Sequence, residues 1–258
     1  DAGGDPGYIR RGVPNLTFDS LASSSAGNAY LVQDGESRLL LECGLPYRRL
    51  QQLMGFSTAD LAGCLVTHEH KDHSRCFGDL LKNGVRVCAS TGTVQALDSS
   101  ILTCLPVDGA DKSYLPFIVG SYDVQPFPVF HDAQEPVGYL VRSRVDGDKL
   151  AFATDTVNLR YRFPGVNILA VECNHAYDIL DRCTRLPEKV RHRITNSHME
   201  LSRLCGWLSS LDLSQCRELY LLHLSDSCSN EGRFVDEVER CVPKHVRVTA
   251  CPKQKEVG

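Results

Sequence analysis

Residues 67–73, directly after an apolar run at 64–66, hold a dense group of metal-competent side chains. The four side chains are His68, His70, Asp72 and His73. No regular helix or strand could aim all of them at one point, but a loop at the end of a buried strand could. Neutral imidazole with an interleaved carboxylate suits divalent transition metals. The segment therefore predicts a metal site at a strand end; a surface loop that is rich in histidine by chance is the alternative.

Short apolar strands are expected to position this loop. The pair Asp34-Gly35 predicts a hairpin between two of these strands. We expect Ser57 and Thr58 to cap a short helix, and residues 73–81 to form a helix directly after the loop. A first part of the chain that is rich in strands precedes a second part in which strands and helices alternate.

The segment 68–73 resembles the HxHxDH signature of the metallo-β-lactamase fold, and the resemblance extends over roughly residues 16–249. It implies an α/β fold of the αββα type, a sandwich of two mixed β-sheets flanked by helices. It also implies further ligands as isolated residues after later strands. Three candidates follow short apolar runs in the expected order: His131, Asp155 and His223. Taken singly, each would more often be an ordinary partly buried histidine or a turn aspartate.

The resemblance implies two divalent metal ions, and ligands of these types hold zinc, manganese or iron. One ion would be held by His68, His70 and His131, and the other by Asp72, His73 and His223, with Asp155 bridging them. The two ions would convert a bridging water to hydroxide and stabilise the oxygens of an in-line displacement. Asp72 would take part in catalysis by orienting that hydroxide. Glu42 stands where the family usually has an aspartate that orients a ligand histidine, and we expect it to do the same.

Two further segments resemble a narrower group, the single-domain relatives of the YycJ type, which are regarded as nucleases or phosphodiesterases. They are Glu172-Cys173-Asn174-His175 and Asn196-Ser197-His198-Met199. This makes His175 and His198 candidate catalytic residues. His198 could donate a proton to the leaving oxygen or bind a phosphate, because the ordinary pKa of histidine lies near working pH. A structural hydrogen bond is the alternative for each ring. Ala176 departs from the group, which often has an aspartate there.

A basic run at residues 182–193 leads directly to His198. It contains Arg182, Arg185, Lys189, Arg191 and Arg193. Such a run can bind the phosphates of a nucleic acid beside the site without reading its sequence. The alternative is an ordinary solvated face.

The composition of the 258 residues, 42% apolar and 23% charged, is that of a globular enzyme. The net charge of −4 gives no global attraction to nucleic acid or to a membrane, so a polyanionic substrate needs a local basic patch. We expect no membrane contact, because no apolar run is long enough to span a bilayer. Twelve irregularly spaced cysteines without a Cys-x-x-Cys pair favour free thiols and a cytoplasmic location. We expect residues 1–15 to be a flexible leader and residues 16–258 to form one domain.

The function that these observations favour is a metal-dependent phosphodiesterase, specifically a DNA-directed nuclease of the exonuclease kind that uses a hydroxide activated by two metals. A hydrolase of a small phosphodiester or thioester, such as a cyclic nucleotide or a glutathione conjugate, is the second interpretation. A non-catalytic binding module on a decayed metal site is the third. The complete set of ligand candidates argues against decay, and the glutamate at position 42 is the feature that favours it.

Overall fold

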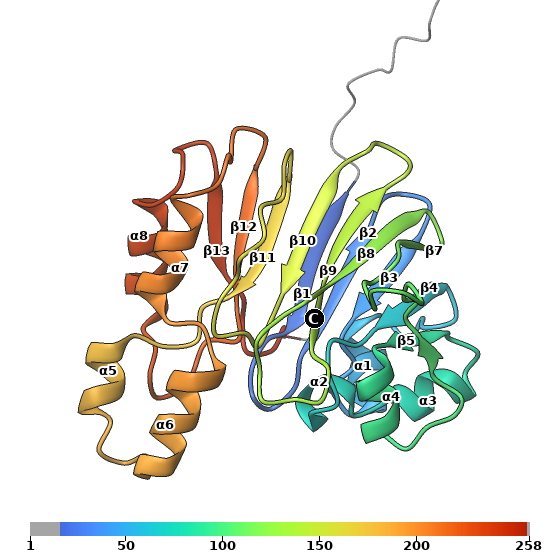
Figure 1. Ribbon diagram of the computed structural model, residues 1–258, viewed down its shortest axis with the longest axis horizontal. Helices are drawn as coiled ribbons and strands as arrows, with labels where there is room; N and C mark the ends of the chain where they lie inside the picture. The colour runs from blue at the N-terminus through green and yellow to red at the C-terminus, as the bar shows by residue number, and fades with distance from the viewer. Residues whose placement is uncertain (1–15, 257–258) are drawn as a thin grey trace, which may run out of the picture.

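Two mixed β-sheets packed face to face organise the chain (Figure 1). The structure is a computed structural model that describes residues 16–256, so the predicted leader at 1–15 lies outside the described residues. The strands of the first sheet lie in the order β1 (Thr17–Ala22), β2 (Ala29–Gln33), β3 (Arg38–Leu41), β4 (Leu61–Leu65), β5 (Val87–Ala89) and β6 (Thr103–Cys104). Those of the second lie in the order β13 (Arg247–Ala250), β12 (Glu218–Leu222), β11 (Ile168–Glu172), β10 (Lys149–Ala153), β9 (Val137–Ser143), β8 (Tyr122–Pro128) and β7 (Phe117–Val119).

Each sheet changes from antiparallel to parallel pairing partway across. In the first sheet β2 and β3 pair antiparallel, whereas β3 and β4 pair parallel. In the second sheet β9 and β10 pair antiparallel, whereas β10 and β11 pair parallel. The β2–β3 hairpin turns at Asp34 and Gly35, as predicted, and Gly35 has a φ of 88°. Within a sheet, strands that run in one direction end at one edge. In the second sheet β8, β10, β11 and β12 therefore release their loops on the same side, and in the first sheet β3 and β4 do so.

Aromatic side chains fill the space between the sheets. Tyr30 from the first sheet meets Phe152 from the second at a ring-centroid distance of 5.3 Å, and neither ring is exposed. The buried hydroxyl of Tyr139 on β9 donates a hydrogen bond of 2.7 Å to the carbonyl of Val66, which directly follows β4. This bond ties the second sheet to the backbone that leads into residues 68–73.

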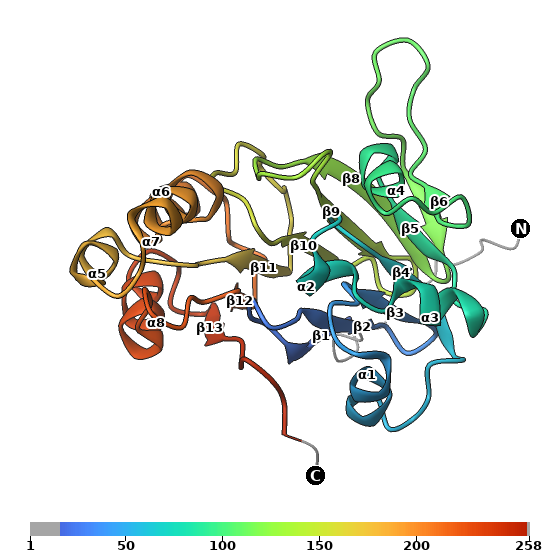
Figure 2. The same cartoon turned by 90° about the horizontal axis from the view of Figure 1, so that it is seen from below.

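Helices cover the outer faces of both sheets (Figures 1 and 2). The first sheet packs against α1 (Tyr47–Leu53), α3 (Phe77–Lys82) and α4 (Thr91–Ala96), and the second against α7 (Leu201–Leu208) and α8 (Glu231–Glu239). The predicted αββα architecture is confirmed. Three helices lie toward the strand ends: α2 (Lys71–Ser74), α5 (Tyr177–Arg182) and α6 (Glu188–Ser197). Within residues 16–256, no helix is both long and apolar enough to cross a membrane.

Two expected helices differ from the structure. Ser57 and Thr58 do not cap a helix: the hydroxyl of Ser57 bonds to Asp60 at 2.9 Å in a turn, and β4 follows at once. The helix expected at 73–81 is split into α2 and α3, because Cys76 leaves helical geometry at φ −110° and ψ 21°. The prediction that residues 16–258 make one domain stays a prediction, although the core between the sheets draws side chains from both halves of the chain.

The loop at 68–73 is held in place by a close contact between two backbone segments. The amide of Asn28 donates to the carbonyl of Asp72 at 2.8 Å, and the amide of Gly44 donates to the carbonyl of Asn28 at 2.9 Å. Gly44 lies so close to the loop that a Cβ atom there would fall 1.6 Å from the carbonyl oxygen of Asp72. Only glycine can occupy this position without displacing Asp72.

We expect Gly44→Ala to lower the free energy of unfolding by about 3 kcal/mol, because the added methyl group has no space and the loop must move. The matched control is Gly78→Ala on α3, where a new Cβ would meet nothing within 4 Å. Urea denaturation of both variants measures the difference. Equal stability of the two variants would contradict a close contact between Gly44 and the carbonyl of Asp72.

Candidate metal centre

Three histidine rings converge at the ends of β4 and β8. His68 and His70 come from the loop after β4, and His131 comes from the loop after β8. Nε2 of His68 lies 3.1 Å from Nδ1 of His70, and Nε2 of His131 lies 3.2 Å from the same atom. The three residues form a group that could hold a metal ion.

These contacts fit a cation better than a set of hydrogen bonds. Two nitrogens at hydrogen-bond distance can share one proton, but Nδ1 of His70 faces two partners at once. It cannot satisfy both with one hydrogen or one lone pair. A metal ion, in contrast, accepts one lone pair from each ring. Burial lowers the pKa of His131, and burial with the charge of neighbouring rings lowers the pKa of His68 well below its usual value. Both rings are thus held in the neutral form that binds metals.

A second group that could hold a metal ion lies beside the first and mixes carboxylates with histidines. Its members are Asp72 and His73 on α2, Asp155 after β10 and His223 after β12. Nε2 of His73 lies 3.3 Å from Oδ2 of Asp72, and Nε2 of His223 lies 3.6 Å from that oxygen. Burial disfavours the charged form of His223, but Asp155, Asp72 and Glu172 outweigh it and raise its pKa to about 10. The carboxylates thus stabilise a positive charge at this position.

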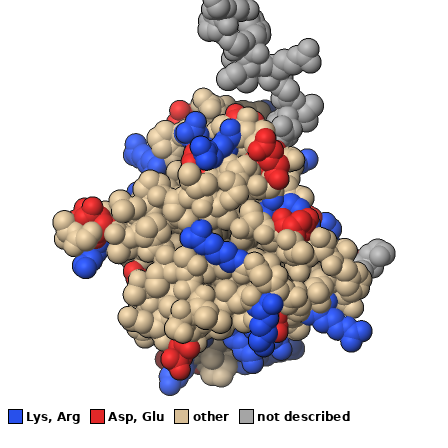
Figure 3. Space-filling view, turned by 90° about the vertical axis from the view of Figure 1, so that its right-hand side faces the viewer, with Lys and Arg blue, Asp and Glu red and all other residues tan. Residues whose placement is uncertain are grey.

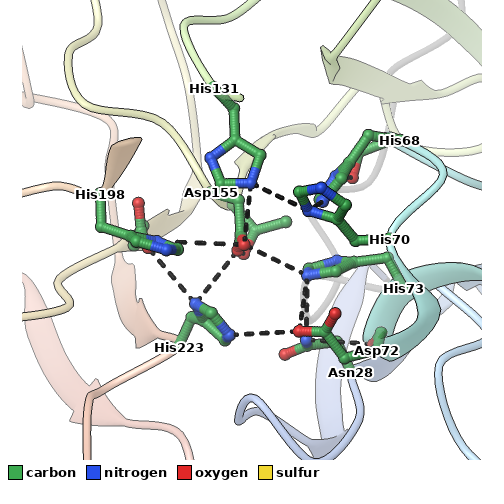
Figure 4. Close-up of polar contacts among 12 residues, drawn as sticks. Asn28, His68, His70, Asp72, His73, His131, Asp155, His198 and His223 are labelled. Atoms are coloured by element: carbon green, nitrogen blue, oxygen red, sulfur yellow. Dashed lines mark hydrogen bonds and ion pairs between the residues drawn. The ribbon is translucent and has the colours of Figure 1, made fainter. Parts of the chain in front are cut away.

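Asp155 lies between the two groups (Figure 4). Its Oδ2 is 3.3 Å from Nε2 of His73 and 3.6 Å from Nε2 of His131, while its Oδ1 is 3.1 Å from Nδ1 of His223. The carboxylate is almost fully buried, at 2% exposure. One side chain therefore contacts members of both groups, as a bridging ligand would.

Three buried residues of the candidate metal centre have left-handed backbone conformations. Glu42, Asp155 and His223 each follow a strand and have φ values of 65°, 44° and 52°. A side chain in this region costs about 1–3 kcal/mol, so it persists only where surrounding contacts impose it. Each turn ends its strand within one or two residues and places the side chain near the ends of the neighbouring strands.

Contacts behind the rings fix their orientation. Nδ1 of His131 donates to the carbonyl of Ser197 at 2.9 Å, which leaves Nε2 facing the other histidines. Oε1 of Glu42 accepts from the amide of Thr67 at 3.2 Å, and Oε2 of Glu42 lies 3.6 Å from Nδ1 of His73. Glu42 therefore reaches a histidine of the second group from behind and belongs to neither metal-competent group. The orienting role expected from the sequence stays a prediction, and this position allows it.

Glu172 is a central residue that sequence reasoning missed. It ends β11, is fully buried, and lies 2.6 Å from Nδ1 of His198 and 3.3 Å from Nδ1 of His223. Burial alone would lower the pKa of His198, but the Glu172 carboxylate outweighs it and raises this pKa. The signal was present: a carboxylate inside the apolar strand Ile-Leu-Ala-Val-Glu must have a partner. Asp155, Glu172, His198 and His223 form a third group that could hold a metal ion.

Asn28 was also missed, because it reads as an ordinary turn residue. Its Nδ2 lies 3.2 Å from Nε2 of His73, and it also donates to the carbonyl of Asp72 at 3.2 Å. It thus helps to place two neighbouring candidate ligands.

The structure does not bring His175 into the site. Its ring is fully buried, lies against Tyr177 at a centroid distance of 5.6 Å, and lines neither cavity near the histidine groups. Neither ring nitrogen has a hydrogen-bond partner among residues 16–256. The expectation that His175 is catalytic is therefore corrected, because a ring closed off from the cavities cannot contact a substrate.

The basic run divides between the site and the surface. Arg193, on α6, lines a cavity of about 350 Å³ over the metal-competent groups, together with Lys71 and His198. Nε of Arg193 donates to Asp132 at 2.6 Å. Four of the five basic residues do not line this cavity; they are Arg182 on α5, Arg185 in the loop that follows, and Lys189 and Arg191 on α6.

The sequence and the fold are similar to those of known proteins. The chain is 31% identical to the exodeoxyribonuclease YycJ of Bacillus anthracis over 230 residues, which are 81% of this chain and 83% of that one. It is 29% identical to the exodeoxyribonuclease WalJ of Streptococcus pneumoniae over 222 residues, 81% of each chain. Among solved structures it is similar to the metallo-β-lactamase-fold protein YhfI of Bacillus subtilis, with a TM-score of 0.68 and 18% identity over 93% of this chain and 98% of that one. No family model matches the sequence.

We expect the protein to bind two divalent ions per chain after metal loading, and Asp155→Ala to lose at least one, because its carboxylate contacts both groups. Asp34→Ala is the matched control, since Asp34 is equally buried but bonds to Ser121 and Ser143 instead. Elemental analysis gives the metal content of each variant. An Asp155→Ala variant that retains two ions would exclude a bridging role.

Proposed function

The chain belongs to the YycJ family of metallo-β-lactamase-fold proteins, and from this premise we propose that it is a metal-dependent phosphodiesterase that degrades DNA from an end. The observation that carries the proposal is the position of Asp155, between two metal-competent groups and below a cavity lined by Lys71 and Arg193. Such a cavity suits a phosphodiester, which carries negative charge and needs its charge neutralised during attack.

The proposal assigns the candidate ligands to two divalent ions. His68, His70 and His131 would hold one ion, Asp72, His73 and His223 the other, and Asp155 both. Divalent ions held there would lower the pKa of water to supply a nucleophile and would neutralise the charge on the phosphate oxygens. The mixture of imidazole and carboxylate fits zinc, manganese or iron.

Asp72 would orient the attacking water, and His198 with Glu172 would supply a proton to the leaving oxygen. Asp72 lines the cavity, so it can accept a hydrogen bond from the attacking water and fix its direction. Glu172 accepts the Nδ1 hydrogen of His198 at 2.6 Å and stabilises the protonated ring. Nε2 of that ring can then donate a proton to the leaving oxygen, as a general acid does.

Basic side chains would hold the DNA backbone. Arg193 and Lys71 line the cavity, so they are placed to contact the phosphate under attack or its neighbour. Arg182, Arg185, Lys189 and Arg191 would extend this contact along α5, α6 and the loop between them. The distribution of basic residues alone does not identify a binding path for DNA. On the face drawn in Figure 3, Lys and Arg lie scattered among Asp and Glu over a largely uncharged surface. Within the run at 182–193, Arg193 is distinguished because it lines the cavity, and the other four basic residues lie in the same run of sequence.

The two other interpretations are less well supported. A decayed site would not be expected to keep the buried contacts of Glu42, Asp155 and Glu172, which carry a cost without a cation to hold. A hydrolase of small phosphodiesters or thioesters gains no support from the relatives, which are both named exodeoxyribonucleases. We also propose a cytoplasmic location, since all twelve cysteines are free thiols in the structure.

We expect His198→Ala to lower kcat about 10²–10⁴-fold on end-labelled DNA, because the leaving oxygen loses its proton donor. KM and metal content should stay unchanged. His192→Ala is the control, as His192 is an exposed ring on α6, the helix that ends one residue before His198. If His198→Ala instead loses a metal ion, the ring is a ligand in the third group and the acid role is wrong.

Arg193→Ala should weaken DNA binding about equally for all sequences and reduce by about one the slope of log affinity against log salt concentration. The matched control is Arg144→Ala. Both arginines are about half exposed, with side-chain exposures of 57% and 54%, and both pair with an aspartate, but Arg144 lies in the turn after β9. Fluorescence anisotropy with labelled DNA over a salt series measures both effects.

The proposal as a whole is tested by incubating the wild-type protein, loaded with manganese or zinc, with end-labelled single- and double-stranded DNA and RNA. Progressive shortening of DNA from an end supports it. Cleavage of a small phosphodiester while every nucleic acid stays intact would overturn the assignment of substrate.

A further inference from the structure

A second cavity opens beside the metal-competent groups. It has a volume of about 320 Å³ and shares three lining residues, Ser25, His198 and His223, with the cavity that Arg193 lines. The two cavities therefore meet at the candidate general acid and at one candidate metal ligand. A ligand whose charged part occupies the first cavity can extend into the second.

One wall of the second cavity is apolar, whereas polar and charged side chains line the first. Leu186, Val190 and Ile194 line it at a spacing of four residues, which places them along one face of α6 and the residues just before it. Within the described chain, none of the three belongs to a hydrophobic core cluster. Val190 is 41% exposed. This apolar stripe thus faces the cavity instead of the protein interior.

Polar groups lie on the other side of the same cavity. Asn174, Ser225, Asp226 and Ser227 line it, from the loops after β11 and β12. Asn174 is only 5% exposed, and its Nδ2 donates to the carbonyl of His223 at 2.8 Å. Its Oδ1 has no hydrogen-bond partner among residues 16–256.

We propose that this cavity is a nucleoside subsite, which receives the sugar and base on one side of the phosphate that is cleaved. The inference rests on the proposed function, because it takes the phosphate to lie in the adjoining cavity. A nucleoside has flat apolar surfaces for the α6 stripe, and hydroxyl and amino groups for the polar side. A volume of 320 Å³ is at the lower end for small-ligand pockets, and so suits one nucleoside and not several.

The subsite explains how the protein could hold a DNA end without reading its sequence. Contact between aliphatic side chains and the face of a sugar or base is tolerant of base identity, whereas hydrogen bonds to base edges are not. The basic run supplies attraction to phosphates, and the apolar stripe on the same helix places the terminal unit against His198.

Binding measurements test the subsite separately from catalysis. The probes are inorganic phosphate, thymidine 5′-monophosphate and thymidine 3′-monophosphate, titrated by calorimetry into the metal-loaded wild-type protein and into Val190→Ser. We expect one of the two nucleotides to bind the wild-type protein at least about tenfold more tightly than phosphate, because it adds apolar contact. Val190→Ser should reduce this ratio about threefold to tenfold and leave the affinity for phosphate unchanged.

The matched control is Val145→Ser, because Val145 is exposed to a similar extent, 38%, and lies in the turn after β9. This variant should keep the wild-type ratio. The proposal is overturned if neither nucleotide binds more tightly than phosphate, or if Val190→Ser leaves the ratio intact. If the protein binds a nucleotide more tightly than phosphate but cleaves no DNA, the subsite is supported and the proposed nuclease activity is wrong. If it degrades DNA but binds neither nucleotide more tightly than phosphate, the activity is supported and the subsite is wrong.

Discussion

Buried negative charge at the meeting edge of two sheets is the constraint on which the structure depends. Asp155, Glu42 and Glu172 are each at most 2% exposed, so each must be compensated by neighbouring rings, amides or cations. The compensation is drawn from both sheets: Glu42 bonds to the amide of Thr67, Glu172 to the amides of Thr156 and Met199, and Asp155 contacts four histidines. Loops that are far apart in sequence are thereby held together.

The same constraint accounts for the shape of the cavities above the centre. Rings and carboxylates are held from behind, by Ser197 at His131 and by Glu42 at His73, so that their other atoms face a common space. Arg193 and Lys71 then meet that space from two different elements. Charge concentrates in the first cavity and apolar surface in the second. A substrate with a charged linkage between two less polar groups matches this division.

Much of the centre could be predicted from the sequence, because the signal was local. Residues 68–73 carry four candidate ligands in one loop, and the positions of His131, Asp155 and His223 after apolar runs reflect the strand ends that the structure contains. The hairpin at Asp34-Gly35 follows from turn chemistry alone.

What the sequence left open depends on contacts between distant segments. Glu172 begins a recognised segment, yet its partner His198 is 26 residues away, and only the contact of the loop after α6 with the end of β11 brings them together. His175 belongs to the same segment, yet its ring is fully buried and lines neither cavity. The break between α2 and α3 coincides with backbone bonds to a distant segment, because the amide of Cys76 donates to the carbonyl of Cys43 and the amide of Cys43 donates to the carbonyl of His73, and no local propensity encodes these bonds.

Anomalous X-ray scattering from crystals loaded with manganese or zinc would locate the ions. We predict two peaks, one among His68, His70 and His131 and the other among Asp72, His73 and His223, with the Asp155 carboxylate between them. A single peak would contradict it. So would a second peak located between Glu172 and His198, since that would make His198 a ligand and leave the leaving oxygen without the proposed proton donor.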